Sequence, residues 1–144
     1  MAKKPKKVLF GGVFDLLHWG HVLQICRAST FGTQLVVHVA SDKMVRNKKG
    51  ENRPVIPEDE RVKLVRHVKE VAEVVCFSDW ERLDMEALIK IVKPDVVVLN
   101  HGEKPLYNEE NICKKHGIEI VRLHRAESSS GLDTTKIIER IKAL

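Results

Sequence analysis

Short apolar runs alternate with amphipathic segments along the whole chain. Runs rich in β-branched residues, which are typical of buried strands, lie at 8–10, 35–40, 74–77, 96–99 and 118–123. Segments with apolar residues at helical spacing lie at 21–31, 83–92, 108–116 and 134–143, and shorter helices are expected from residue 42 and from Pro57. About five strands alternating with helices predict an α/β fold, a Rossmann-like, doubly wound parallel sheet with helices on both faces.

Glycine, proline and acidic residues mark where these elements begin and end. Gly11 and Gly12 follow the first run and indicate a tight turn. Acidic residues after Pro57 suit the first turn of a helix, and Asp133 can cap the final one. Because ligands bind beyond the carboxyl ends of the strands in such sheets, the site is expected in the loops after the first, second, fourth and fifth strands.

The positive charge is concentrated at the N-terminus. The chain has 144 residues, the size of one domain, and a net charge of +5. Residues 1–7 hold four lysines and are interpreted as a basic tail, with a single domain over 8–144. Without those four lysines, 21 basic residues face 20 acidic ones, so no nucleic-acid partner is expected. No apolar run reaches the roughly 18 residues of a membrane span, so no membrane partner is expected either.

The three cysteines indicate neither a disulfide framework nor a metal site. Cys26, Cys76 and Cys113 are far apart, and no Cys-x-x-Cys pair exists. Each lies in an apolar stretch and is expected to act as a small core side chain. Unpaired thiols suit a reducing compartment, so a cytoplasmic protein is expected.

The loop after the first strand holds residue types that bind phosphate. His18 and His21 stand three apart at the entrance to a helix, and Gly20 directly precedes the second histidine. Glycine lets the backbone approach a ligand, the N-terminus of a helix favours phosphate, and imidazole N–H groups add directional hydrogen bonds. Taken alone, such a pair also fits a solvent-facing or capping role, and a zinc pair lacks a third ligand at useful spacing.

Two other ring side chains have open or ordinary interpretations. Trp19 either packs on the loop or touches the substrate. His38 lies inside the second apolar run and is expected to be a core or strand-end histidine whose hydrogen bonds are satisfied.

Two blocks at opposite ends of the chain resemble the signature of the cytidylyltransferase-like nucleotidyltransferase superfamily. The first reads Gly12-x-Phe14-Asp15 and then His18-x-Gly20-His21. The second, at 131–138, reads Gly-Leu-Asp-Thr-Thr-Lys-Ile-Ile and is similar to the family's Gly-Ile-Ser-Thr-Thr-Lys-Ile. The likeness spans residues 8–142 in family order.

A third stretch resembles particular branches of this family. Lys48-Lys49-Gly50 and the segment 53–61 resemble the family's lysine loop and the helix after it. These segments are most similar to the nucleotidyltransferase domain of ADP-heptose synthase and to archaeal FAD synthetase, which use ATP. The resemblance therefore favours ATP over CTP, and it implies a homodimer because relatives commonly form one.

The resemblance implies attack by a substrate phosphate on the α-phosphorus of the nucleotide, with pyrophosphate leaving. His18 and His21 would contact the phosphates, and Lys48 or Lys49 would swing in from a mobile loop to neutralise them. Mg²⁺ would bridge the leaving pyrophosphate, with no direct protein ligand assigned. The implied nucleotide-binding residues are Gly12, Val13, Phe14, Gly20, Asn100, Gly131, Thr134 and Thr135.

Departures from the family pattern narrow the range of acceptor substrates that is expected. Many relatives have Thr where this chain has Val13, and Asp133 replaces a serine. Glycerol-3-phosphate cytidylyltransferase has an arginine at the position of Ser128, and its Gly-Asp-Asp-Trp run is replaced by residues 100–103. These losses argue against glycerol 3-phosphate, so the expected acceptor is a sugar phosphate or another phosphorylated small molecule.

Other functions stay open at this point. The departures would permit a nucleotide-binding module without turnover, or a cytidylyltransferase acting on a polyol phosphate. A nicotinamide-binding dehydrogenase lacks its Gly-x-Gly-x-x-Gly after the first strand. A class I aminoacyl-tRNA synthetase fragment would share His-x-Gly-His, but the chain lacks the Lys-Met-Ser-Lys-Ser loop.

Overall fold

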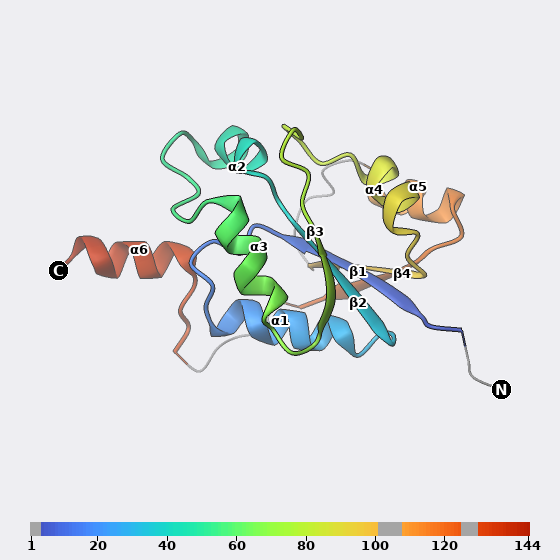
Figure 1. Cartoon of the computed structure of the whole chain (residues 1–144). Coiled ribbons are helices and arrows are strands. Elements are labelled where there is room, and N and C mark those ends of the chain that lie inside the picture. The colour runs from blue at the N-terminus through green and yellow to red at the C-terminus, as the bar shows by residue number, and fades with distance from the viewer. Residues whose placement is uncertain (1–3, 101–107, 125–129) are drawn as a thin grey trace.

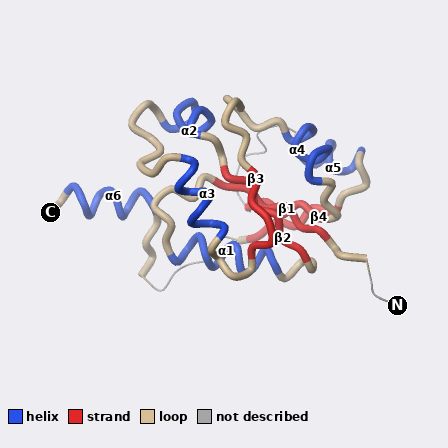
Figure 2. Tube along the Cα trace, in the orientation of Figure 1, coloured by secondary structure: helices blue, strands red, loops and turns tan. Residues whose placement is uncertain are grey.

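A computed structural model describes residues 4–100, 108–124 and 130–144 as one parallel sheet flanked by helices (Figure 1). The five strands have the order β3-β2-β1-β4-β5, and Figure 2 shows them at the centre of the molecule. They are β1 (Lys7–Gly12), β2 (Gln34–Val39), β3 (Val71–Val75), β4 (Val96–Asn100) and β5 (Glu119–Leu123). The helices are α1 (Trp19–Ser29), α2 (Asp42–Lys49), α3 (Glu58–Arg66), α4 (Met85–Val92), α5 (Glu109–Lys115) and α6 (Thr134–Lys142). The predicted Rossmann-like α/β class is confirmed.

Side chains that alternate along β1 build two separate cores. Val8 points to one face, where it packs in a cluster with Ile25 of α1 and Val65 of α3. Leu9 points to the other face and packs in a cluster with Leu88 of α4. Because helices cover both faces, the central strands are apolar at successive positions. Each fully buried side chain of this kind contributes roughly 1.5–3 kcal/mol.

The third strand departs most from its predicted position. The apolar pattern predicts 74–77, whereas β3 spans Val71–Val75. β3 lies at the edge of the sheet and two residues in its middle are exposed, so hydropathy marks it poorly. Its pairing with β2, which begins with Val71 opposite Leu35, sets its bounds instead, and Phe77 falls in the loop that follows.

The strand order creates a switch point at the centre of the sheet. The chain passes from β1 to β2 and β3 on one side, and then crosses to β4 and β5 on the other. The loops after β1 and β4 part there, which is where parallel sheets of this kind hold ligands. The last helix, α6, extends away from the body of the molecule, and none of its residues is fully buried (Figure 1). Within the described ranges, no helix combines the length and apolarity that a membrane span needs.

Candidate functional site

A cavity of about 890 Å³ opens at the carboxyl edge of the sheet. The predicted site residues that line it are Gly12, Val13, Phe14, His18, Gly20, His21, Lys48, Lys49, Asn100, Thr134 and Thr135. Gly131 is the exception, because it lies outside the cavity lining with φ of 66° in the turn before α6. The cavity therefore brings together residues from both ends of the chain.

The two histidines are held in place by the first turn of α1. His18 is the N-cap, and its Nδ1 accepts a hydrogen bond from the backbone N–H of Gly20 at 3.1 Å. Nδ1 of His21 accepts from the backbone N–H of His18 at 3.3 Å. The two rings stack with centroids 3.8 Å apart. Because each Nδ1 accepts a bond, each ring carries its proton on Nε2 and presents a donor.

Gly20 makes room for the ring of His18, and Gly12 makes room for the ring of Phe14. A Cβ at Gly20 would lie 3.0 Å from Nδ1 of His18, so a larger residue would displace the ring. A Cβ at Gly12 would lie 2.9 Å from the ring of Phe14. Phe14 is only 4% exposed, has φ of 55°, and packs its ring against His21 with centroids 5.6 Å apart. Phe14 thus supports a histidine from behind, a contact that the motif alone does not reveal.

The C-terminal motif reaches the same histidine pair. The Thr134 hydroxyl donates to the backbone carbonyl of Asp15 at 3.1 Å, and its oxygen lies 3.4 Å from Nε2 of His18. Asp133 caps α6, because its carboxylate accepts from the backbone N–H of Lys136 at 2.8 Å. The N-terminus of α6 therefore faces the cavity beside His18, with its acidic residue engaged in the cap.

Lys48 and Lys49 lie in a helix and not in the loop that the motif predicts. They are the last two residues of α2, so the expectation that they belong to a loop is wrong. The helix starts at Ser41, whose hydroxyl accepts from the N–H of Met44 at 3.1 Å, and ends at Gly50 with φ of 98°. Both lysines line the cavity and are exposed. From the end of α2, the reach of their side chains brings their charge to the cavity.

Arg61 binds the loops after β1 and β2 to each other. It is fully buried and donates to the carbonyls of Val13 at 2.7 Å, Ala40 at 2.8 Å and Ile56 at 2.8 Å. It also pairs with the carboxylate of Asp42 at 2.7 Å. The sequence pattern places this arginine in a family-like helix but does not predict that it joins these loops.

Asp15 performs a similar function on the other side of the loop. It is 1% exposed and accepts hydrogen bonds from the N–H groups of Val55 at 2.8 Å and Ile56 at 2.9 Å, and from Arg53 Nε at 3.2 Å. Burial opposes ionisation, but these hydrogen bonds and the Arg53 charge lower the pKa of Asp15. Its charge therefore stabilises the loop.

Asn100 marks the flank of the cavity beside β4 and β5. Its side-chain oxygen accepts from Nε2 of Gln24 at 3.0 Å, and Gln24 in turn accepts from Arg27 at 3.1 Å. Arg27 also donates to the carbonyl of His124 at 2.6 Å. This chain of contacts orients the carboxamide of Asn100 at the cavity wall. The neighbouring residues 101–103, and Ser128, fall outside the described residues.

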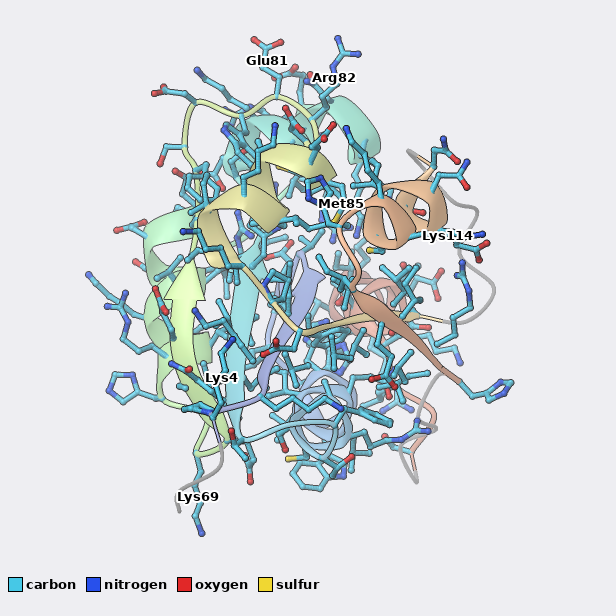
Figure 3. The ribbon with its side chains drawn as sticks, turned by 90° about the vertical axis from the view of Figure 1, so that its right-hand side faces the viewer. Lys4, Lys69, Glu81, Arg82, Met85 and Lys114 are labelled. Atoms are coloured by element: carbon cyan, nitrogen blue, oxygen red, sulfur yellow. The ribbon has the colours of Figure 1, made fainter. Side chains whose placement is uncertain are left out.

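The flank beside β2 and β3 contains residues that the sequence patterns missed. Glu81, Arg82 and Leu83 line the cavity together with Met85 of α4, although only the other four strands were expected to contribute loops. Figure 3 shows Glu81 and Arg82 projecting from the loop before α4, whereas Met85 lies within the body of the molecule. No local motif marks this segment; it reaches the site because β3 lies beside β2.

His38 differs from its expected state. It is 3% exposed and lines the cavity, but its Nε2 has no hydrogen-bond partner among the described residues, so the expectation of a satisfied histidine is wrong. The rings of Phe77 and Trp80 lie 6.1 Å and 6.0 Å from its own. Burial lowers its pKa from 6.5 to about 4, so the ring is neutral at physiological pH.

Two further expectations from the sequence concern Trp19 and metal-binding side chains. Trp19 is 58% exposed and does not line the cavity. In the part of the chain that the structure describes, no three His, Cys, Asp or Glu residues gather closely enough to hold a metal ion.

Comparison with known proteins agrees with this geometry. The family model described as cytidylyltransferase-like matches residues 9–140. An FAD synthase from Thermococcus kodakarensis is 39% identical over 148 residues, which cover 98% of this chain and 96% of that protein. The bifunctional protein HldE from a Nitratiruptor species is 35% identical over 99% of this chain, but only 29% of that protein is covered.

A solved structure has a similar fold. The lipopolysaccharide core biosynthesis protein from Thermoplasma volcanium superposes with a TM-score of 0.72 and 30% sequence identity. The match covers 85% of this chain and 99% of that one. Similarity of sequence and similarity of fold thus point to the same family.

Proposed function

Because the chain belongs to the cytidylyltransferase-like family and is a nucleotidyltransferase, we propose that it transfers AMP from ATP to the phosphate of a small molecule. The observation that carries the proposal is the meeting of His18, His21 and Thr134 at one cavity wall. The imidazoles of His18 and His21 and the backbone N–H groups that open α6 at Thr134 come from opposite ends of the chain and converge where the proposal puts the triphosphate.

The chemistry is a single in-line displacement. An oxygen of the acceptor phosphate forms a bond to the α-phosphorus of ATP, and the bond from that phosphorus to the oxygen bridging to the β-phosphate breaks. Pyrophosphate leaves with the bonding electrons. The Nε2–H groups of His18 and His21 donate to phosphoryl oxygens, where negative charge increases in the transition state. One preorganised donor of this type contributes roughly 10²–10³ in rate.

Charge neutralisation comes from two other elements. Lys48 and Lys49 extend from the end of α2 toward the phosphates, and the backbone N–H groups at Thr134 and Thr135 open the N-terminus of α6. Mg²⁺ would bind together with the oxygens of the triphosphate. In that position it would neutralise the leaving pyrophosphate.

FMN is the acceptor that similarity favours. FAD consists of FMN and AMP joined through a pyrophosphate linkage, so an FAD synthase joins AMP to the phosphate of FMN. The Thermococcus relative carries that name and is covered over 96% of its length. A sugar phosphate is the second candidate, because the chain also matches part of HldE and a lipopolysaccharide core biosynthesis protein.

A pyrophosphate-release screen tests the proposal. Purified protein with Mg²⁺ is combined with ATP or CTP and with FMN, sugar phosphates or polyol phosphates. The expected result is pyrophosphate release that needs ATP and FMN together and yields FAD. Release with CTP and a polyol phosphate would point to cytidylyl transfer instead. ATP binding without pyrophosphate release for any acceptor would contradict turnover and leave a nucleotide-binding module.

A homodimer is also proposed. Ile141 on the protruding α6 is 58% exposed, and no residue of that helix is fully buried within the described protomer. Together with Ile137 and Ile138, which are only partly buried, Ile141 forms an apolar face on α6 that gains burial if a second copy covers it. Size-exclusion chromatography with light scattering measures the mass, and a monomer at micromolar concentration would contradict the proposal.

A further inference from the structure

We propose that Arg27 and Gln24 are positioning residues that fix which end of the Asn100 carboxamide faces the bound nucleotide. Asn100 then offers N–H donors, so the atom that it recognises is a hydrogen-bond acceptor of the nucleoside, a ring nitrogen or a ribose oxygen, and not the amino group of the base. The inference deepens the proposed function and rests on it, because it names the chemistry by which the nucleoside part of ATP is held.

The evidence is a chain of hydrogen bonds that can run in one direction only. A guanidinium group has N–H donors and no acceptor, so the Gln24 atom that lies 3.1 Å from Nη1 of Arg27 has to be Oε1. The other end of this carboxamide is the NH₂ group, and its Nε2 donates to Oδ1 of Asn100 at 3.0 Å. Because Oδ1 of Asn100 faces Gln24, Nδ2 occupies the other end of the Asn100 carboxamide.

A backbone carbonyl directly after β5 favours the same orientation. The carbonyl of His124 accepts from Nη1 of Arg27 at 2.6 Å and, more weakly, from Nε2 of Gln24 at 3.5 Å. Gln24 is only 9% exposed, and a reversed carboxamide would turn its NH₂ group toward the guanidinium and its oxygen toward the carbonyl. Buried polar groups that face their own kind lose their hydrogen bonds, which is unfavourable. The positive charge of Arg27 therefore sets the orientation of both carboxamides.

The place of Gln24 on α1 indicates which part of ATP reaches Asn100. Residues three apart on a helix lie on the same side, so Gln24 stands one turn beyond His21, about 4.5 Å along the axis. Gln24, His21 and Asn100 all line the cavity. Since the proposed function puts the triphosphate on the histidine pair, the group one turn further along α1 is the nucleoside that is attached to the triphosphate.

The orientation of Asn100 limits what the ligand can offer at this point. An N–H donor matches a lone pair, which adenosine presents at its ring nitrogens and at its ribose oxygens. The 6-amino group of adenine is itself a donor, and two donors that face each other form no hydrogen bond. Asn100 therefore recognises an acceptor atom, and Gln24 and Arg27 act through Asn100.

The test reverses this orientation with the substitution Gln24→Glu. A carboxylate only accepts, so it keeps the contact with Arg27 but draws Nδ2 of Asn100 toward itself, and Oδ1 then faces the ligand. Adenosine is the probe, because it has no phosphate that the added negative charge could repel. Its Kd, measured by NMR titration, is expected to rise about 5-fold to 100-fold, since an acceptor of the ligand then faces an acceptor of the protein. The Kd for FMN, measured by quenching of its fluorescence, should stay within about twofold.

Thermal unfolding separates this effect from damage to the fold. The Tm of Gln24→Glu should equal or exceed that of the wild type, because a charged acceptor strengthens the hydrogen bond from Arg27. Gln34→Glu is the matched control, since Gln34 begins β2 and does not line the cavity, and its Kd for adenosine should stay within about twofold. Asn100→Asp is the second variant. It keeps an acceptor for Nε2 of Gln24 but has no donor, so its Kd for adenosine should also rise about 5-fold to 100-fold.

The remaining outcomes count against the inference. Unchanged adenosine affinity in Gln24→Glu or in Asn100→Asp would overturn it, and so would a loss of FMN affinity in place of adenosine affinity. A lower Tm of Gln24→Glu, with weaker binding of both ligands, would show a purely structural role and overturn it as well. A wild-type protein that binds adenosine and ATP, with both variants weakened as expected, but that releases no pyrophosphate with any acceptor would overturn the proposed transfer and leave this inference standing.

Discussion

The hydroxyl oxygen of Thr134 lies 3.4 Å from Nε2 of His18, although 116 positions separate the two residues in the chain. The Thr134 hydroxyl donates its own proton to the carbonyl of Asp15, so its oxygen accepts from His18. A phosphate entering the cavity would compete for the same N–H. The contact therefore holds the ring of His18 in the orientation that a phosphate needs.

His18 has two functions, since it caps α1 through Nδ1 and donates through Nε2, and a substitution can remove the second function while it keeps the first. His18→Asn keeps an acceptor for the first turn of α1, because asparagine is a good N-cap, but it removes the Nε2–H group. Turnover is expected to fall about 10²–10³-fold while the free energy of unfolding changes by less than about 1 kcal/mol. Pyrophosphate release and urea denaturation measure the two quantities. Near-normal turnover would contradict the assigned role.

Gly20 allows a second test of the same ring. In Gly20→Ala the new methyl group would lie 3.0 Å from Nδ1 and Cε1 of His18 and would push the ring away from Thr134. We expect turnover to fall about tenfold to a hundredfold, as is typical of a misplaced catalytic group. Alanine favours a helix over glycine by about 1 kcal/mol, so stability should not fall in parallel. A variant that is fully active would show that the ring tolerates the displacement.

The sequence predicted much of the fold because its central strands are buried on both faces. The runs at 8–10 and 96–99 are apolar at successive positions, which marks strands of a covered parallel sheet, and β1 and β4 lie there. The edge strand β3 has exposed residues, and the apolar pattern predicts its start three positions and its end two positions too late. Its bounds depend on pairing with β2, which is a non-local interaction.

The site was predictable where a residue type is tied to a local motif. His18, Gly20 and His21 follow one another in the chain, so their spacing already places them on one turn of helix. His38 and Arg82 could not be assigned in this way. Each reaches the cavity only because β2 lies next to β1 and β3 lies next to β2 in the sheet, and that order leaves no trace in the neighbouring sequence.

Arg61 should be a stability determinant. Arg61→Met keeps much of the side-chain volume but leaves the carbonyls of Val13 and Ala40 and the carboxylate of Asp42 without their donor. Removing one partner of a buried pair destabilises by about 3–5 kcal/mol. Urea denaturation measures the loss, and Arg66→Met on the exposed side of the same helix is the control, expected within about 0.5 kcal/mol of wild type. Equal stability of the two variants would rule out this role.

The buried state of His38 predicts a specific dependence of stability on pH. Its pKa is 6.5 when unfolded and about 4 in the fold, because burial disfavours the charged ring. Between these values the unfolded chain binds a proton that the native protein does not, so stability falls as pH falls from about 6.5 to about 4. The loss approaches about 3 kcal/mol at the lower end. His38→Leu lacks this group and should lose less stability over the same interval.

The difference between the wild type and His38→Leu isolates the contribution of His38 to the pH dependence of stability. The pKa of Asp15 is lowered in the fold by its hydrogen bonds, so its contribution to stability is also lost in acid, but in both proteins alike. Urea midpoints measured at half-unit steps of pH give the comparison. Parallel curves for wild type and His38→Leu would mean that His38 is solvated or hydrogen-bonded in the native protein.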